Sequence, residues 1–280
     1  MPIPIPDPVK VADLLREVAA LEILPRFGKL EACDIREKKP GNLVTVADEA
    51  AERWLAQGLT ALMPGSRLVG EEGTAADPEM LRHLQSDDAV WVVDPIDGTA
   101  NYCSGRPIFA VMVALLTRGE TLAAWIYDPL AKEMLSAVKG EGAWLDGAPV
   151  RVASAASPAT MKGAWSYRSI RDKPRRAALK RHHYFHGDPG DLRCAGREYA
   201  ELSRGLRHFA NYHSLMPWDH APGVFIHREA GGFAAFADDG APYDVERLSG
   251  PLLMAPDRDA WEALREFAFG EIGASSATTA

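Results

Sequence analysis

The chain has 280 residues, of which 47% are hydrophobic and 25% are charged. This composition is that of an ordinary globular protein, so disordered and fibrous classes are excluded. The formal net charge of −8 argues against nucleic acid as a partner, because binding to the phosphate backbone needs a basic face. A phosphate ester remains a possible substrate, since a bound divalent cation reverses the local sign of charge in an acidic pocket.

The first half of the chain is predicted to form two helices followed by strands. Apolar residues at helical spacing predict helices over residues 9–27 and 48–62, and Pro64 and Gly65 end the second one. Short apolar runs with turn residues between them predict strands. These strands span residues 67–70, 90–93, 109–116, 121–127 and 143–145. Residues 139–142 and 146–147 are predicted hairpin turns.

The second half begins after a loop or linker at residues 153–158. Beyond it we expect a basic stretch at 172–183, a helix at 196–205, a helix from Trp218 and a strand at 233–236. The predicted organisation is a mixed α/β protein in two halves. These are residues 1–152 and 153–272, with a frayed tail at 273–280.

The three cysteines, Cys33, Cys103 and Cys194, are widely spaced and form no CxxC pair. Neither a zinc site nor a disulfide framework is expected, and each thiol is interpreted as a small buried hydrophobic group. The first residues lack the charged start and apolar run of a signal peptide. No segment approaches the ~18 consecutive apolar residues of a membrane span. The sequence therefore predicts a soluble, cytoplasmic protein with no membrane partner.

The most informative segment, residues 91–99, reads Trp-Val-Val-Asp-Pro-Ile-Asp-Gly-Thr. An apolar strand leads into Asp94 and Asp97, and a turn formed by Pro and Gly can aim both carboxylates at one point. The carbonyl of Ile96 can join them, and Gly98 permits a conformation in which N–H groups face a phosphate. Such oxygen ligands suit Mg²⁺ and not zinc. The alternative interpretation is an Asp-rich turn that caps a helix.

Two other acidic positions stand before and after this segment. Glu71 and Glu72 follow the predicted strand at 67–70. Glu71 either bridges a metal ion and a water, or forms part of a solvated turn. Asp219 follows Trp218 at the start of a predicted helix, where it is either a metal ligand or an N-cap.

Together these motifs resemble the inositol monophosphatase family, which consists of lithium-sensitive, Mg²⁺-dependent phosphatases. The motifs are Glu71-Glu72, Asp94-Pro-Ile-Asp97-Gly-Thr99, and Trp218-Asp219 followed by Glu229-Ala-Gly-Gly232. Fructose-1,6-bisphosphatase and the nucleotide 3′-phosphatases belong to the same superfamily. The resemblance implies a layered αβαβα sandwich of the sugar-phosphatase type, commonly a homodimer, with metal ions between the two halves.

The resemblance also implies a role for each matching residue. The implied metal ligands are Glu71, Asp94, the Ile96 carbonyl, Asp97 and Asp219. Glu71 and Thr99 would activate the attacking water, and the amides of Gly98 and Thr99 would hold the phosphate. Residues 43–48 resemble the threonine-alanine-aspartate motif of the family, which makes Asp48 a partner of Thr99. Two or three Mg²⁺ ions are implied; one lowers the pKa of the attacking water and another neutralises the leaving alkoxide.

The expected substrate contacts are Arg193, Gly196, Arg197 and Tyr212. Residues 193–196 resemble the arginine-x-x-glycine stretch of the family, but Arg197 replaces a small residue. Tyr212 occupies the place of a glutamate found in inositol-specific members. These differences leave open histidinol phosphate, a sugar bisphosphate, or a nucleotide such as 3′-phosphoadenosine 5′-phosphate as the substrate. Arg193 either holds a second anionic group or forms a structural ion pair.

Two basic stretches remain open between functional and structural interpretations. Lys38 or Lys39 can reach the rim of the pocket, as a lysine does in the family. Residues 180–186 read Lys-Arg-His-His-Tyr-Phe-His and fit no zinc signature. They form either a solvated face or a contact to a substrate anion.

A different class of function is a regulatory binding module that kept the fold and lost the chemistry. Two observations oppose it: every implied ligand is present, and the acidic charge disfavours nucleic acid. A purely structural role is also disfavoured, because four carboxylates without a metal ion would repel one another. The sequence therefore predicts a Mg²⁺-dependent phosphatase that acts on a small phosphorylated metabolite.

Overall fold

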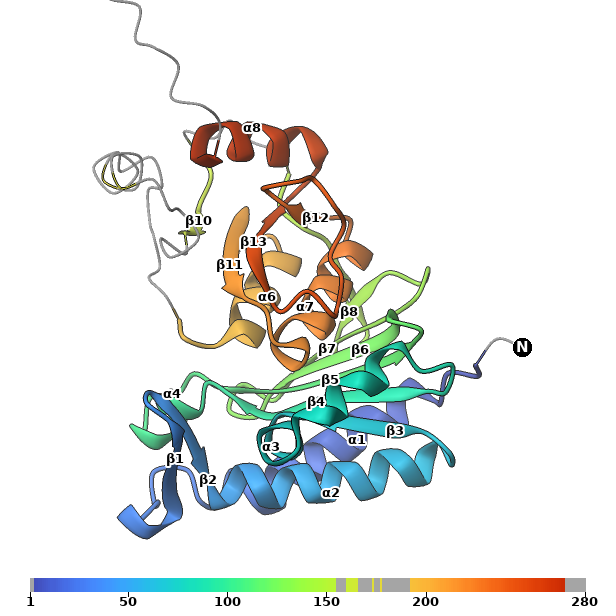
Figure 1. Cartoon of the computed structure of the whole chain (residues 1–280), viewed down its shortest axis with the longest axis vertical. Helices are drawn as coiled ribbons and strands as arrows, with labels where there is room; N and C mark the ends of the chain where they lie inside the picture. Colours follow the sequence, from blue (N-terminus) through green and yellow to red (C-terminus); the bar gives the residue numbers. More distant parts are fainter. Residues whose placement is uncertain (1–2, 155–159, 166–172, 174–176, 178–191, 270–280) are drawn as a thin grey trace, which may run out of the picture.

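A computed structural model describes residues 3–154, 160–165, 173, 177 and 192–269 of the chain (Figure 1). Helices and sheets alternate in five layers, in the order α, β, α, β, α, which confirms the predicted sandwich. The expected linker at 153–158, the basic stretch at 172–183 and the tail at 273–280 lie mostly or wholly outside the described residues. No helix in the described ranges combines the length and the hydropathy needed to span a membrane.

The first two layers come from residues before 151. Helix α1 (Pro8–Val18) continues as a π-helical turn (Ala19–Ile23), and α2 (Val46–Leu62) packs beside it. Both cover one face of a seven-stranded sheet in which only β3 and β4 run parallel. Its strands, in order, are β3 (Arg67–Gly70), β4 (Val90–Asp97), β5 (Ala110–Thr117), β6 (Glu120–Asp128), β7 (Glu133–Val138), β8 (Ala143–Leu145) and β9 (Ala148–Val150).

The central strands are buried on both faces, which explains their unbroken apolar sequence. On one face Trp91, Val113 and Trp125 belong to the core that includes α1 and α2. On the other face Val92 and Met112 belong to the core that includes the helices of the third layer. The alternation of side chains along β4 therefore decides which residues reach that third layer.

The third layer consists of α6 (Ala195–Ser203) and α7 (Pro217–Glu229). These two helices approach closely at Gly223, where an ideal Cβ would lie 2.0 Å from the ring of Tyr199. A four-stranded sheet covers them, and α8 (Arg258–Phe269) packs on its outer face (Figure 1). The strands of this sheet, in order, are β10 (Gly163–Trp165), β11 (Phe209–Ser214), β13 (Ser249–Ala255) and β12 (Phe233–Phe236).

Several elements differ from the sequence-based expectations. The predicted strand at 90–93 continues to Asp97, and the α-helix expected to reach residue 27 gives way to a π-helical turn at Ala19. Several of the missed strands carry partly exposed or polar residues, whereas an apolar run was the signal that the expectation used. Strand β13 was missed although its residues 252–255 form such a run. The elements not anticipated are β1 (Ile35–Lys39), β2 (Asn42–Thr45), α3 (Glu71–Ala76), α4 (Thr99–Cys103), β7, β9, β10, β13 and α8.

His227 connects the third layer to the fourth. Its side chain is fully buried near the end of α7, and Nε2 lies 3.0 Å from the carbonyl oxygen of Ala255 on β13. The ring fills the space above Gly232, where an ideal Cβ would lie 2.2 Å from Nε2. Burial lowers the pKa of His227 from 6.5 to about 4, against the opposing effect of its backbone hydrogen bonds.

The free energy of unfolding should therefore fall as the pH drops below 6.5. Between pH 6.5 and about 4 the unfolded chain binds a proton at this imidazole that the folded protein excludes, so acid favours unfolding. We expect His227→Gln to flatten this dependence by roughly 2 kcal/mol over that range. Urea unfolding across the range measures it, with the half-buried His83→Gln as the matched control. Parallel profiles for wild type and His227→Gln would contradict the prediction.

Candidate active site

A β-bulge in β4 places two carboxylates on the same face of the large sheet. Residues three apart in a regular strand point to opposite faces. Here Asp94 pairs with Met112 and Asp97 pairs with Ala110, so three steps along β4 match two along β5. The extra residue restores the alternation, and both aspartates face the third layer while the side chain of Ile96 faces α1 and α2. The expected turn at the strand end is thus a bulge inside the strand.

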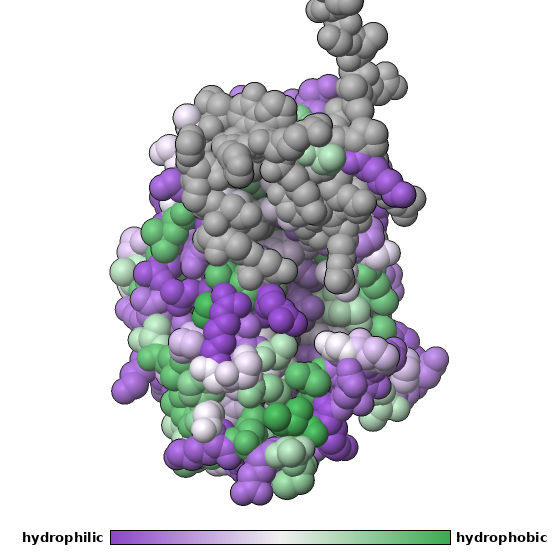
Figure 2. Space-filling view, turned by 90° about the vertical axis from the view of Figure 1, so that its left-hand side faces the viewer, coloured by the Kyte–Doolittle hydropathy of each residue, from purple (hydrophilic) through white to green (hydrophobic). Residues whose placement is uncertain are grey.

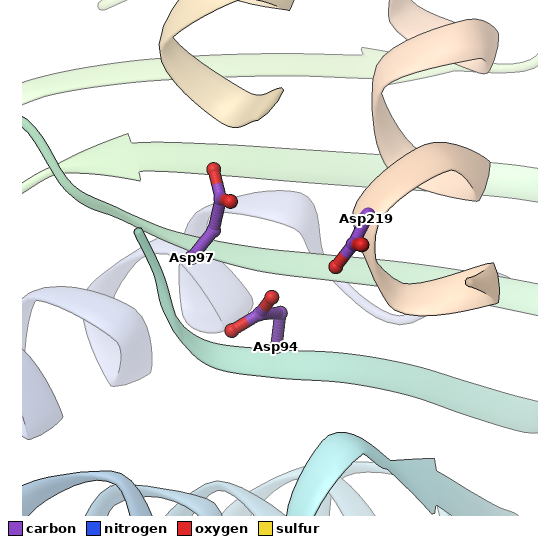
Figure 3. A group of neighbouring side chains, drawn as sticks. All are labelled: Asp94, Asp97 and Asp219. Atoms are coloured by element: carbon purple, nitrogen blue, oxygen red, sulfur yellow. The ribbon is translucent and has the colours of Figure 1, made fainter. Parts of the chain in front are cut away.

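Asp219 approaches the same point from the first turn of α7. One carboxylate oxygen each from Asp94, Asp97 and Asp219 lies within 4.8 Å of the others. Figure 3 shows the three side chains directed into the space between β4 and α7. Asp94 and Asp97 are buried and Asp219 is partly buried. The structure therefore brings together three of the residues predicted to bind metal.

Burial and mutual repulsion make this cluster unfavourable without a cation. Burial raises the pKa of Asp94 well above its usual range, and the charges of Glu71, Asp219 and Asp97 raise it further. Burial likewise raises the pKa of Asp219, assisted by Asp97 and Glu71. A divalent ion would offset both the burial of these charges and their mutual repulsion, and the donors are hard carboxylate oxygens. The residues present thus fit a metal ion of the Mg²⁺ type.

Asp97 is held by the start of α6. Its Oδ1 accepts a hydrogen bond from the amide of Ala195 at 3.1 Å, and its Oδ2 accepts one from the amide of Gly196 at 2.6 Å. The thiol of Cys194 also donates to Oδ2, at 3.0 Å. Burial raises the pKa of Asp97, although these three hydrogen bonds act in the opposite direction. Gly196, expected to contact substrate, therefore lies against the aspartate cluster.

Glu71 is paired with a lysine next to the aspartate cluster. Lys38, on β1, donates to Glu71 at 2.7 Å and to both oxygens of Glu72 at 2.9 and 3.1 Å. Burial alone would lower the pKa of Lys38, but the charges of Glu71 and Glu72 and the hydrogen bonds to them have the larger effect, so its pKa is raised. Burial also raises the pKa of Glu72, to about 7. Glu71, although predicted to bind metal, does not belong to the group of carboxylates that lie within 4.8 Å of one another, but its charge raises the pKa of Asp94 and Asp219.

A buried carboxylate on α2 fixes the backbone that carries Glu71. The side chain of Glu52 accepts hydrogen bonds from the amides of Glu72 at 2.8 Å and Gly73 at 2.7 Å. These amides belong to the first turn of α3, where no partner exists within the helix. An ideal Cβ on Gly70 would lie 2.4 Å from the carboxylate carbon of Glu52, so only glycine permits this approach.

Thr99 and Asp48 meet beside the bulge. The Thr99 hydroxyl lies 3.0 Å from the carbonyl oxygen of Ile96 and 3.3 Å from Oδ1 of Asp48. The other oxygen of Asp48 accepts from both the amide and the hydroxyl of Thr45, which forms a capping box at the start of α2. Burial raises the pKa of Asp48 to about 7. The predicted pair of Thr99 and Asp48 is therefore in contact.

Gly98 forms the corner between β4 and α4. Its φ of 90° lies in the left-handed region, which favours glycine. An added Cβ would also lie 3.0 Å from the carbonyl oxygen of Ile108. The chain can thus turn sharply from Asp97 into α4, and the amides of Gly98 and Thr99 come directly after the carboxylate cluster.

The two arginines that were expected to contact substrate, Arg193 and Arg197, differ from each other in their surroundings. The guanidinium of Arg197 donates to Asp128 at 2.7 Å and lies 3.4 Å from Glu201. Arg193 is exposed, and its backbone has a φ of 54°. Residues 180–186 lie outside the described ranges. Figure 2 shows the side of the molecule that carries α4 and the β1–β2 hairpin, with hydrophilic residues across its middle.

Tyr212 lies in a stack of aromatic rings between α6, α7 and β11. Its ring centroid is 5.2 Å from that of Tyr199 and 4.8 Å from that of His220. Nε2 of His220 lies 2.9 Å from the carbonyl of Ser214 and donates to it, so Nδ1 accepts from the Tyr199 hydroxyl, also at 2.9 Å. Burial lowers the pKa of His220 to about 4 and keeps the ring neutral.

The sequence analysis did not identify the contacts of several residues that hold the site together. Cys194 was interpreted as a hydrophobic residue, and Glu52 was not singled out. Lys38 was placed at the pocket rim without a partner. No local pattern identifies such residues, because their partners are distant in the chain; Cys194 and Asp97, for example, are 97 residues apart.

Comparison with known proteins identifies the family to which these motifs belong. A family model described as the inositol monophosphatase family matches residues 8–264. An inositol-1-monophosphatase of Rhizobium meliloti (strain 1021) is 30% identical over 247 residues, covering 86% of this chain and 88% of that protein. A histidinol-phosphatase of Chlorobaculum parvum is 30% identical over 223 residues, covering 76% and 82%. A Nus factor SuhB of Xylella fastidiosa is 30% identical over 249 residues, covering 83% and 86%.

Solved structures share the fold. The Thermotoga maritima IMPase superposes with a TM-score of 0.74 at 25% identity, covering 91% of this chain and 95% of that one. A dual specific IMPase/NADP phosphatase bound with D-inositol-1-phosphate superposes with a TM-score of 0.77 at 18% identity, covering 94% and 95%. The second likeness concerns the fold alone.

Asp94→Asn should stabilise the metal-free protein and remove its response to Mg²⁺. Near neutral pH, folding must either bury the Asp94 charge beside other carboxylates or bind a proton there, and both cost free energy. The amide avoids this cost, so the free energy of unfolding in EDTA should rise by roughly 1–3 kcal/mol. Urea unfolding with EDTA and with Mg²⁺ measures both effects, and the exposed Asp87→Asn is the control. Wild-type stabilisation of Asp94→Asn by Mg²⁺ would refute the assignment.

Proposed function

This chain belongs to the inositol monophosphatase family and is a phosphoric monoester hydrolase; from that premise we propose that it uses Mg²⁺ to hydrolyse a small phosphorylated metabolite. The observation that carries the proposal is the group formed by Asp94, Asp97 and Asp219. Three partly or fully buried carboxylates from two elements converge on one point, where oxygen ligands suit a hard divalent cation.

The chain's own residues would hold and orient the reactants. Asp94, Asp97 and Asp219 would hold metal, with Glu71 and the Ile96 carbonyl completing the ligand set. When bound, Mg²⁺ would lower the pKa of the attacking water and neutralise the developing negative charge. Thr99 and Glu71 would orient that water, and Asp48 would accept the proton through the Thr99 hydroxyl, 3.3 Å away.

The phosphate group would bind at the corner formed by Gly98. The amides of Gly98 and Thr99 stand at the start of α4, and the left-handed conformation of Gly98 allows the chain to turn there. Amides at a helix start have no partner within the helix and suit an anion. The phosphorus would thus lie between these donors and the metal-binding carboxylates.

The substrate remains a choice among small phosphate esters. The relatives include an inositol-1-monophosphatase and a histidinol-phosphatase. The neutral aromatic Tyr212 at the expected position of a glutamate leaves room for histidinol phosphate or a nucleotide 3′-phosphate. We also propose that the protein binds two or three Mg²⁺ ions and is sensitive to lithium. It would be cytoplasmic and form a homodimer.

Phosphate release from a substrate panel tests the proposed function. The panel contains inositol-1-phosphate, histidinol phosphate, fructose-1,6-bisphosphate, 3′-phosphoadenosine 5′-phosphate and NADP, each with Mg²⁺ and with EDTA. We expect release from at least one member that depends on Mg²⁺ and disappears with EDTA. If Mg²⁺ binds but no ester is hydrolysed, the result favours the alternative of a binding module. One relative is named a Nus factor and not a phosphatase.

Asp48 should give the reaction an acid limb. Burial raises the pKa of Asp48 to about 7, and its protonated form cannot accept a proton from Thr99. Turnover should therefore fall as the pH drops through about 7, or lower once a cation binds nearby. Asp48→Asn should lower kcat by roughly 10²-fold or more.

The pH profile of kcat distinguishes this role from general damage to the fold. Residual turnover of Asp48→Asn should lack the acid limb, whereas the neighbouring Glu49→Gln should keep it. An unchanged acid limb in Asp48→Asn would assign the titration to another group.

A further inference from the structure

Asp97 receives its hydrogen bonds from three consecutive residues. Two donors are the amides of Ala195 and Gly196, and the third is the thiol of Cys194. The amides belong to the first turn of α6, so they have no acceptor within that helix. Cys194 supplies the single side-chain donor of the three. Asp97 is therefore oriented mainly by the segment that precedes and starts α6.

The position of the thiol is fixed by close packing. Cys194 is 2% exposed, and an ideal Cβ on Gly98 would lie 3.3 Å from the Cβ of Cys194. Asn101 secures the chain just before it, because its Nδ2 donates to the carbonyl of Leu192 at 2.9 Å and to that of Arg193 at 3.3 Å. The sulfur consequently has little freedom to leave the carboxylate.

These hydrogen bonds also limit how Asp97 can meet a cation. An ionised carboxylate offers about four lone-pair positions. Three are directed to donors, two on Oδ2 and one on Oδ1. Loss of the thiol bond would free a second position and leave two backbone amides to fix the orientation of the carboxylate. The thiol thus restrains a predicted metal ligand without touching the metal.

We propose that Cys194 is a positioning residue that orients Asp97 for binding Mg²⁺, an inference that rests on the proposed function. The sequence alone suggested a small hydrophobic group at this position, and the structure shows a hydrogen-bond donor in contact with a carboxylate. Residues that orient metal ligands typically change metal affinity when they are replaced.

Calorimetric titration with Mg²⁺ tests the proposal without measuring turnover. Cys194→Ala removes the donor, and we expect Mg²⁺ affinity to fall roughly tenfold. Cys194→Ser keeps a donor of similar size and should recover most of that loss. The exposed Cys33→Ala is the matched control and should bind Mg²⁺ as wild type does. In turnover, the alanine variant should need more Mg²⁺ for half-maximal rate, with a smaller change at saturating Mg²⁺.

Infrared spectroscopy observes the same hydrogen bond in folded wild-type protein, so the test survives an alanine variant that fails to fold. One S–H stretching band should lie below those of Cys33 and Cys103, disappear in Cys194→Ser, and move when Mg²⁺ is added. Wild-type affinity in Cys194→Ala, equal losses in the alanine and serine variants, or an S–H band that ignores Mg²⁺ would overturn the positioning role alone. Failure of wild-type protein to bind Mg²⁺ would overturn the proposed function with it.

Discussion

The site depends on one extra residue in β4. Without the bulge between Asp94 and Asp97, strand alternation would direct one of them toward α1 and α2, into the core formed with Trp91 and Val93. With the bulge, both carboxylates face α7, where Asp219 completes the group. Pro95 suits this place, since a bulge tolerates a residue that cannot donate to the strand ladder. The Ile96 carbonyl oxygen, inside the bulge, lies 3.0 Å from the Thr99 hydroxyl.

Carboxylates held so close together repel one another, and different parts of the fold offset this repulsion at different carboxylates. Lys38 offsets part of the charge of Glu71 and Glu72, while the start of α6 supplies donors to Asp97. Asp94 accepts one backbone bond, from the amide of Ile96 at 3.0 Å. Burial and neighbouring carboxylates raise the pKa of both Asp94 and Asp219 well above the usual range. The unbalanced charge is therefore greatest where a cation would bind, and the surrounding compensation confines it to that point.

The sequence predicted the elements that have a local residue pattern, and it missed the contacts between segments that are distant in the chain. The apolar runs of the buried strands predicted a mixed α/β protein, and the resemblance of the acidic motifs to the inositol monophosphatase family implied the five-layer fold and the group of Asp94, Asp97 and Asp219. Strand β7 was missed because partly exposed residues interrupt its buried ones, and the bulge was predicted as a turn because Pro and Gly signal both. The bond from Cys194 to Asp97 and the pairing of Lys38 with Glu71 join segments 97 and 33 residues apart. No spacing rule in a single sequence reveals such contacts.

The surroundings of the expected substrate residues narrow how recognition can work. Arg197 already contacts Asp128 and Glu201, so a substrate anion would have to compete with two carboxylates for its guanidinium. That competition makes Arg197 a weak source of binding energy for a second phosphate. Tyr212, by contrast, stacks on Tyr199 and makes a tilted ring contact with His220, and His220 stays neutral because burial lowers its pKa to about 4. Tyr199 and His220 are buried and Tyr212 is partly exposed, so a substrate near β11 would meet a single neutral ring that its neighbours hold in place. Such a contact favours shape and stacking over ion pairing.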